Sequence, residues 1–374
     1  MINKERIINE FNKLISFDSL SFHEKNIYEY LINKLKSLGL KIIVDDAGKK
    51  LSNNNDSGNN IYAILEGNKK GEPILFSSHM DTVSPGINKK AIIDGDIIKS
   101  SGDTILGADD VTGIVSILEA LNIIKENNLS HPDIEVVFFV AEEPYCKGSS
   151  VFDFNIIKSK IAYVLDLQGS VGTAAISAPS IFSFEIDVLG KSAHAGFEIE
   201  KGISSILISS EAISKIKFGR LDENTTLNIG TINGGDGKNI VPEKTIIKGE
   251  LRSNNRLYAL DILNNIKNVF DEVSKKYNGI SKFSYNEDIM AYKIDINSYV
   301  VKRYQNALNS LGYGKAILVD TFGGSDNNNF NKNGILGIVI SNAMNNIHTK
   351  NEYFKISELI KSINITLKLM TMED

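Results

Sequence analysis

Short apolar runs alternate with segments of helical periodicity along most of the chain. Residues 74–77, 136–140 and 162–165 are largely apolar throughout, which is typical of strands buried on both faces of a sheet. Between the first two runs, residues 110–127 carry apolar side chains on one helical face. This alternation predicts an α/β fold whose mostly parallel sheet is covered by helices on both faces.

Two helices are expected to open the chain. The second is predicted to begin at Ser21-Phe22-His23-Glu24, because S-x-x-E is the sequence form of a capping box. Apolar residues keep helical spacing from residue 27 to residue 38, and Gly39 is a typical helix stop. The S-x-x-E segment is therefore interpreted as a helix start.

The pattern changes after about residue 178 and resumes after about residue 290. The order of the elements between these points is β-α-β-β-α-β, which is ferredoxin-like. The predicted elements are a strand at 181–189, a helix at 202–218, strands at 226–232 and 245–251, a helix at 256–277 and a strand at 280–285. We therefore predict an inserted α+β domain at 179–287, within a larger domain formed by 1–178 and 288–374.

Composition narrows the functional classes. The 374 residues carry a net charge of −5, so the chain lacks the positive surface that nucleic acid requires. No apolar run approaches the roughly 18 residues of a membrane span, and the charged N-terminus does not resemble a signal peptide. The single cysteine, Cys146, allows neither an internal disulfide nor a cysteine-based zinc cage, and the expected compartment is the reducing cytoplasm.

Acidic residues and histidines follow the carboxyl ends of the predicted strands. In a parallel sheet these ends lie along one edge, where ligands bind, and neighbouring strands are about 4.8 Å apart. Several carboxylates gathered there would repel one another unless a cation neutralised them. The residues in these positions are His79, Asp81, Glu142, Glu143 and Asp166, with Asp109 at the start of a predicted helix and His348 beyond the last strand.

Imidazoles and carboxylates without thiolates suit borderline divalent ions, Zn²⁺ first, with Co²⁺ or Mn²⁺ as alternatives. A pair of such ions can activate water and polarise a carbonyl. Of the adjacent acids Glu142 and Glu143, one can be a ligand and the other a general base, while Asp81 is placed to orient His79. Taken singly, each acid is better explained as a helix cap or a turn residue; the combination is what favours a metal site.

Five segments, taken in order, resemble the metal-binding segments of the di-zinc peptidase T, aminoacylase and carboxypeptidase G family. They are SSHMDTVSPG, ILGADD, AEEP, VLDLQGSVG and NIHTKNEYF, and the likeness is greatest to the peptidase T-like branch. The resemblance implies a zinc-peptidase-like fold, two zinc ions, and an inserted lid that closes over the site and forms a homodimer. It implies that His79 and Asp166 bind one zinc, that Glu143 and His348 bind the other, that Asp109 bridges them, that Glu142 is the general base and that Asp81 lies behind His79.

The resemblance extends to the inserted domain and to a glycine-rich segment. His194, in GKSAHAG, matches a lid histidine that steadies the oxyanion in a neighbouring active site, and Arg252, in GELRSNN, matches an arginine that contacts the substrate carboxylate. Asn233, Gly324 and Ser325 resemble further substrate-facing positions. The simpler alternatives are a hydrogen-bonded loop residue for His194, a surface ion pair for Arg252 and a tight turn for TFGGSD.

Two departures from the family pattern bear on the substrate. Val111 stands where the family often has lysine, and Pro144-Tyr145 stands where it usually has x-Gly. The sequence therefore predicts a cytoplasmic di-zinc hydrolase that acts on short peptides, a tripeptide aminopeptidase in the first place. The alternatives are an amidohydrolase of N-acyl amino acids or other small amides, and a metal-binding protein without activity. A serine hydrolase is disfavoured because the chain lacks a G-x-S-x-G elbow.

Overall fold

The computed structural model describes residues 2–52 and 54–373, and the chain divides into two compact units. The first consists of Met1–Ser177, Lys293–Thr321 and Ser325–Asp374, and the second of Ala178–Tyr292 and Phe322–Gly324. The two main divisions lie within five residues of those drawn from the sequence, whereas Phe322–Gly324 was expected to lie in the larger domain. Among the described residues, no helix is both long enough and apolar enough to cross a membrane.

The first unit is built on a nine-stranded sheet with the order β1-β2-β6-β3-β7-β16-β8-β14, in which β15 also pairs with β8. The central pairs β6–β3, β3–β7 and β7–β16 are parallel, whereas β1–β2 and β2–β6 are antiparallel. The prediction of a mostly parallel sheet is therefore confirmed. The strands are β1 (Lys41–Val44), β2 (Ile61–Leu65), β3 (Ile74–His79), β6 (Ile134–Phe139), β7 (Ile161–Leu167), β8 (Thr173–Ala178), β14 (Tyr292–Lys293), β15 (Ile317–Asp320) and β16 (Leu336–Ser341).

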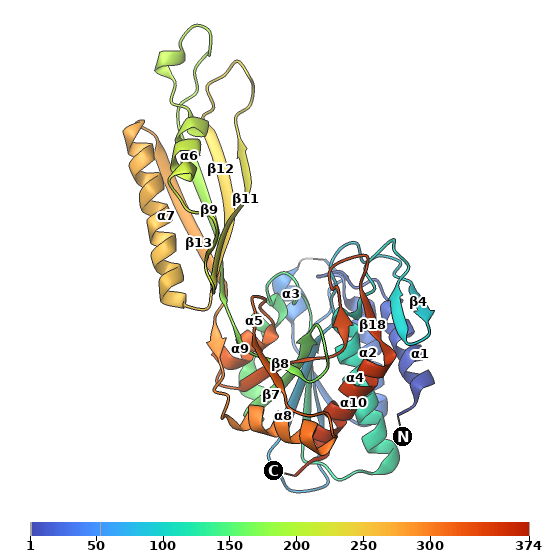
Figure 1. Ribbon diagram of the computed structural model, residues 1–374. Helices are drawn as coiled ribbons and strands as arrows, with labels where there is room; N and C mark the ends of the chain where they lie inside the picture. Colours follow the sequence, from blue (N-terminus) through green and yellow to red (C-terminus); the bar gives the residue numbers. More distant parts are fainter. Residues whose placement is uncertain (1, 53, 374) are drawn as a thin grey trace. The chain divides into compact units, whose positions relative to one another are not determined.

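Successive residues of a strand point to opposite faces of the sheet, so a continuously apolar strand places apolar side chains on both faces. In this unit, helices pack against both faces. Leu75 of β3 belongs to the same buried cluster as Phe330 of α9. The next residue, Phe76, stacks on Tyr163, whose ring lies beside that of Tyr304 of α8. The helices of this unit, seen around the sheet in Figure 1, are α1 (Lys4–Ile15), α2 (Lys25–Leu38), α3 (Ala47–Leu51), α4 (Ala108–Asn127), α5 (Lys147–Ser150), α8 (Tyr299–Ser310), α9 (Asp326–Lys332) and α10 (Ile356–Thr371).

A second, four-stranded sheet in this unit was not predicted from the sequence. Its order is β17-β18-β5-β4, and its strands are short and lack a clear apolar pattern. They are β4 (Ala91–Asp94), β5 (Ile97–Ser100), β17 (Met344–Asn345) and β18 (Tyr353–Lys355). Because β17 and β18 pair with each other, they hold the intervening loop, which contains His348, at both ends.

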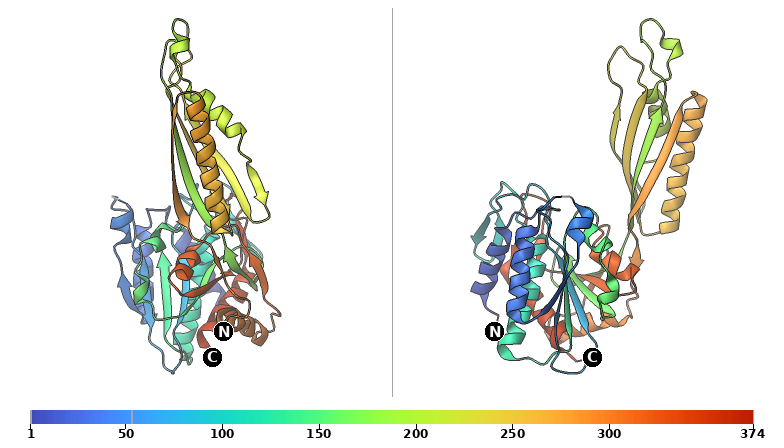
Figure 2. Two further views of the ribbon diagram at one scale, coloured as in Figure 1. Left: turned by 90° about the vertical axis from the view of Figure 1, so that its left-hand side faces the viewer. Right: turned by 180° about the vertical axis from the view of Figure 1, so that it is seen from behind.

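The second unit has the predicted ferredoxin-like order with one additional strand. Its antiparallel sheet runs β10-β11-β12-β9-β13, and β10 is the strand that the sequence did not reveal. Helices α6 and α7 supply buried apolar residues to one cluster with the sheet, and Figure 2 shows α7 running alongside the strands. The elements are β9 (Ser180–Leu189), α6 (Ser205–Ser214), β10 (Gly219–Asp222), β11 (Thr225–Gly234), β12 (Lys244–Ser253), α7 (Arg256–Lys276) and β13 (Ile280–Ile289).

The capping box predicted at the start of the second helix is wrong. Helix α2 begins at Lys25, and its N-cap residue, Glu24, makes no side-chain cap hydrogen bond. The Ser21 hydroxyl donates instead to Asp81, 60 residues further along the chain. The polar side chains of this segment therefore serve a tertiary contact, which a local sequence pattern cannot distinguish from a helix cap.

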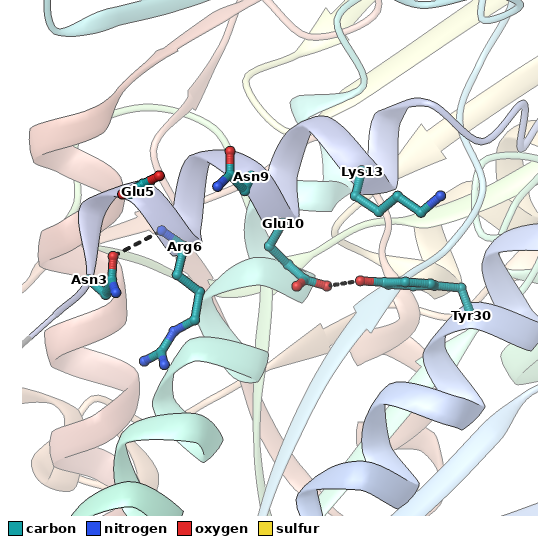
Figure 3. Close-up of a pocket in the computed structure, with 7 residues that line it drawn as sticks. All are labelled: Asn3, Glu5, Arg6, Asn9, Glu10, Lys13 and Tyr30. Carbon is teal, nitrogen blue, oxygen red and sulfur yellow. Dashed lines mark hydrogen bonds between the residues drawn. The ribbon is translucent and has the colours of Figure 1, made fainter.

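Helix α1 is joined to α4 by an ion pair that is suited to a stability test. Figure 3 shows Arg6 pointing away from α1, on one side of a surface pocket that Glu10 and Tyr30 also line. The buried carboxylate of Glu119 on α4 accepts hydrogen bonds from Nε of Arg6 at 2.7 Å and from its Nη2 at 2.8 Å. Exposed Glu126 binds the same guanidinium from the solvent side.

We expect Glu119→Ala to lower the free energy of unfolding by about 2 kcal/mol, because it leaves a partly buried guanidinium without its main partner. Urea denaturation measures this change. Glu126→Ala is the matched control and should change stability little, since an exposed ion pair contributes little. Equal effects of the two substitutions would contradict the assignment of the stabilising contact to Glu119.

Candidate metal centre

The predicted ligands of the first unit lie at one edge of the large sheet. His79 is the last residue of β3, and Asp166 is the last but one of β7. Glu142 and Glu143 follow β6, and Asp109 is the second residue of α4. The topology thus brings side chains from distant parts of the sequence to the carboxyl ends of neighbouring parallel strands, where α/β proteins bind ligands.

The carboxylate of Asp109 lies between two imidazoles. Its Oδ1 is 3.1 Å from Nε2 of His79, and its Oδ2 is 3.1 Å from Nε2 of His348. On the first side, Nε2 of His79 is also 3.8 Å from Oδ1 of Asp166. On the second side, Nε2 of His348 is 3.0 Å from Oε2 of Glu143. Each oxygen of Asp109 therefore faces its own group of histidine and acid.

The donor atoms fit divalent cations. One potential ligand atom from each of His79, Glu142 and Asp166 lies within 4.8 Å of the others, and the same holds for His79, Asp109 and Glu143. Oε1 of Glu143 is buried and has no hydrogen-bond partner among the residues that the structure describes. Burial raises the pKa values of Glu142, Glu143 and Asp166, because low-dielectric surroundings disfavour the charged carboxylates. Positive charge between them would remove this penalty.

Asp81 contacts more than His79, the residue that it was expected to orient. Nδ1 of His79 lies 2.9 Å from the main-chain oxygen of Asp81 and 3.5 Å from its Oδ1. The carboxylate of Asp81 accepts hydrogen bonds from the main-chain N–H groups of Glu142 at 2.9 Å and Glu143 at 3.2 Å, and from Ser21 Oγ at 2.7 Å. Asp81 therefore holds the turn that carries Glu142 and Glu143, as well as the histidine.

Two buried acids that support the cluster were not assigned from the sequence. The carboxylate of Asp110, joined to Asp109 by a cis peptide bond, accepts hydrogen bonds from Ser78 Oγ, from the main-chain N–H of His79 and from Asn342 Nδ2. It thereby ties the start of α4 to the ends of β3 and β16. The sequence did contain a signal for Asp110, namely its position next to Asp109. A helix start needs only one acid as a cap, so a second acid indicates another role.

Glu352 is the second such acid. Its carboxylate accepts hydrogen bonds from the main-chain N–H groups of Leu106 at 2.6 Å, Gly107 at 2.8 Å and Asp109 at 2.9 Å. Glu352 lies four residues after His348, so one loop supplies a histidine to the cluster and also fixes the backbone of Asp109. The segment NIHTKNEYF contained this acid, but its partners lie more than 240 residues away in the sequence.

Tyr145, which stands where the family usually has glycine, lies in the turn that follows Glu142 and Glu143. Tyr145 and Cys146 have φ values of 68° and 53°, so Tyr145 occupies a left-handed conformation that favours glycine. The buried Cys146 thiol donates to Oε1 of Glu142 across 3.3 Å. Val111 is buried in the first turns of α4, where an apolar side chain is well accommodated.

Three further predicted site residues, His194, Arg252 and Asn233, belong to the second unit. In the second unit, His194 Nδ1 accepts a hydrogen bond from the N–H of Gly196 at 3.1 Å. Arg252 on β12 forms an ion pair with Glu250, with Nε 2.6 Å from Oε1, and its Nη1 donates to the carbonyl of Phe322 at 3.0 Å. Asn233 on β11 is exposed.

Gly324 and Ser325 have local packing roles. A Cβ at Gly324 would lie 2.3 Å from Cδ1 of Ile289, so only glycine fits there without movement. Ser325 is the N-cap of α9, and its main-chain N–H donates to Oδ1 of Asn328 at 3.1 Å. These contacts agree with the tight-turn alternative for the TFGGSD segment.

Two family models match parts of the chain. The peptidase dimerisation domain matches residues 176–278, and peptidase family M28 matches residues 60–186. The first match covers most of the second unit, and the second match covers much of the sheet that carries the acidic cluster.

Similar proteins match almost the whole chain. The uncharacterised protein YqjE of Bacillus subtilis is 35% identical, with 99% of this chain and 99% of that protein covered. Among solved structures, aminopeptidase PepT of Bacillus cereus is 34% identical, with a TM-score of 0.90, and a tripeptidase of Staphylococcus aureus is 33% identical, with a TM-score of 0.93. Both of these comparisons cover 99% of this chain and 98% of the other.

Proposed function

The chain belongs to the peptidase T-like metallopeptidases of the M20 family, and from this premise we propose that it is an aminopeptidase that removes the N-terminal residue of tripeptides with the help of two zinc ions. Membership makes it a peptidase; the tripeptide substrate and zinc are the proposal. The observation that carries the proposal is the position of Asp109 between His79 and His348, each within 3.1 Å of a different carboxylate oxygen.

The proposed metal ligands form two sets that share Asp109. His79 and Asp166 would hold one ion, and Glu143 and His348 would hold the other. When bound, the ions polarise the scissile carbonyl and make water more acidic. Carboxylate and imidazole donors favour zinc, and cobalt or manganese can replace it.

Glu142 is the proposed general base. It takes a proton from the attacking water and passes it to the leaving amine, which completes hydrolysis of the peptide bond. Hydrogen bonds to Asp81 and Cys146 fix its main chain and its carboxylate, respectively. Burial raises the pKa of Glu142, which suits a group that must both accept and release a proton.

Two residues of the second unit complete the proposal. His194 would steady the oxyanion in the active site of a neighbouring subunit, and Arg252 would bind the substrate carboxylate. The side chain of Arg252 is 30% exposed, so a carboxylate can reach it. Asn233, Gly324 and Ser325 are proposed as further substrate contacts, from the substrate-facing positions of the family that they resemble.

A substrate panel tests the proposed function. Tripeptides should be cleaved at their first peptide bond, with a kcat/KM at least about tenfold above that of dipeptides or N-acyl amino acids, since a pocket contact commonly discriminates by this amount. The assay measures released amino acids with Zn²⁺, Co²⁺ or Mn²⁺ present. A preference for N-acyl amino acids would instead support the amidohydrolase. Metal binding without hydrolysis across the panel would support the inactive metal-binding protein.

A homodimer is also proposed. The match to the dimerisation domain supports it. Exposed apolar side chains in the second unit also support it: Phe197 is 83% exposed to solvent, Ile199 60% and Leu207 50%. Light scattering should give about twice the chain mass of 41.2 kDa. Phe197→Ser should shift the mass toward the monomer; a wild-type monomer at working concentrations would contradict the proposal.

A further inference from the structure

Three consecutive main-chain N–H groups in the turn after β6 donate to buried carboxylates. Ala141 N donates to Glu24 Oε1 at 3.1 Å, and the N–H groups of Glu142 and Glu143 donate to Asp81. Ala141 has a φ of 47°, so the backbone leaves the strand through a left-handed residue. The direction of the Glu142 and Glu143 side chains therefore depends on contacts from outside the turn.

The segment that was interpreted as a capping box supplies these outside contacts. Glu24 is fully buried, and its Oε1 accepts from both Phe22 N, at 2.8 Å, and Ala141 N. Ser21 Oγ donates to Oδ2 of Asp81. Both polar side chains of the S-x-x-E sequence therefore reach the turn after β6, directly or through Asp81.

The Glu24 carboxylate is not engaged in starting the helix. It forms no side-chain cap hydrogen bond to α2, and its Oε2 has no hydrogen-bond partner among the residues that the structure describes. Such a group is costly to bury unless it serves a tertiary contact. Its long-range partner is Ala141, which directly precedes the proposed base.

We propose that Glu24 is a positioning residue that holds the turn bearing Glu142 and Glu143 through the main chain of Ala141. The inference rests on the proposed roles of these two acids as base and ligand. An acceptor must reach the Ala141 N–H from the start of α2, and the glutamate side chain has the required length. A displacement of about 1 Å at a reacting group can lower a rate by as much as 100-fold, so loss of the hydrogen bond between Glu24 and Ala141 should reduce activity.

Two substitutions separate the effect of the length of the Glu24 side chain from the effect of its charge. Glu24→Asp keeps the charge but withdraws the acceptor, so we expect kcat to fall about tenfold or more, KM to change little, and metal affinity to fall about tenfold. Glu24→Gln keeps an acceptor of the same length and should remain within about threefold of the wild type. Metal affinity is measured by competition with a chromophoric chelator, which requires no activity.

Glu135 offers a matched control on the same strand. Its buried carboxylate accepts from the N–H groups of Lys158 and Ser159, each at 2.9 Å, at the opposite end of β6. Glu135→Asp should lower the melting temperature while kcat and metal affinity stay near wild type at temperatures where the protein is folded. This control separates positioning of the turn from general loss of stability.

Three results would overturn the inference. They are wild-type kcat and metal affinity in Glu24→Asp, equal losses in Glu24→Asp and Glu24→Gln, or a loss in Glu135→Asp that matches the loss in Glu24→Asp at equal melting temperature. If the wild type binds metal but cleaves no peptide, the proposed function fails, and the chelator competition still decides the role of Glu24.

Discussion

Replacing Glu142 with glutamine (Glu142→Gln) is expected to lower kcat by about 1,000-fold while both metal sites still fill, since a positioned general base contributes about 100- to 10,000-fold. Glutamine has nearly the same shape and can still accept the hydrogen bond from Cys146, which the glutamate accepts at 3.3 Å. It cannot accept a proton from water at neutral pH. The loss should therefore appear in kcat, with little change in KM.

The measurement is steady-state hydrolysis of a tripeptide, together with metal content from elemental analysis. Glu66→Gln is the control, because Glu66 is an exposed residue of the same unit and should leave both quantities unchanged. A Glu142→Gln protein with more than about a tenth of wild-type kcat would contradict the assignment of the base.

Removing the metals should abolish activity and also destabilise the first unit. Binding of one ion at a concentration about 1,000 times its dissociation constant adds about 4 kcal/mol to the free energy of unfolding. The effect should be large here because burial disfavours the charged carboxylates of Glu142, Glu143 and Asp166 and raises their pKa values, and neighbouring acids add to this by repulsion. Thermal unfolding before and after chelation, and again after Zn²⁺ is returned, measures it.

The apparent affinity of the cluster for metal should also depend on pH. In the metal-free protein, Asp109 and Glu143 raise the pKa of His348 to about 10, so this imidazole must release a proton before it binds a cation. Raised carboxylate pKa values act in the same direction. Apparent metal affinity should therefore fall as the pH is lowered from about 8 to about 6. An unchanged melting temperature on chelation, or an affinity that rises in acid, would contradict a metal centre at this cluster.

The family likeness and the sheet could be predicted from the sequence because both depend on local patterns. Continuous apolar runs mark the parallel strands β3, β6 and β7, and the similar proteins confirm the peptidase T-like family. The ferredoxin-like order followed from half-exposed strands and amphipathic helices. The small sheet escaped prediction because its strands have only two to four residues, and its two hairpins, β4–β5 and β17–β18, are joined only by the long-range pair β18–β5.

The supporting contacts of the site could not be predicted in the same way. Glu24, Asp110 and Glu352 act on main-chain N–H groups of distant residues, and no local periodicity records such partners. The S-x-x-E pattern even favoured a wrong interpretation, since its two polar residues are also those of a helix cap. The proposed ligands His79, Glu143 and Asp166 could be predicted more readily because they lie at or just beyond the carboxyl ends of apolar strands.

The loop between β17 and β18 sets the order in which the site can be built during synthesis. His79, Asp109, Glu143 and Asp166 leave the ribosome early, but His348 and Glu352 follow only after the whole second unit has been translated. A chain interrupted before β17 would contain four of the five proposed metal ligands, but neither His348 nor Glu352, the acid that fixes the backbone of Asp109. On the proposed ligand assignment, metal loading would therefore be a late event that needs a nearly complete chain, and products truncated before β17 should be inactive.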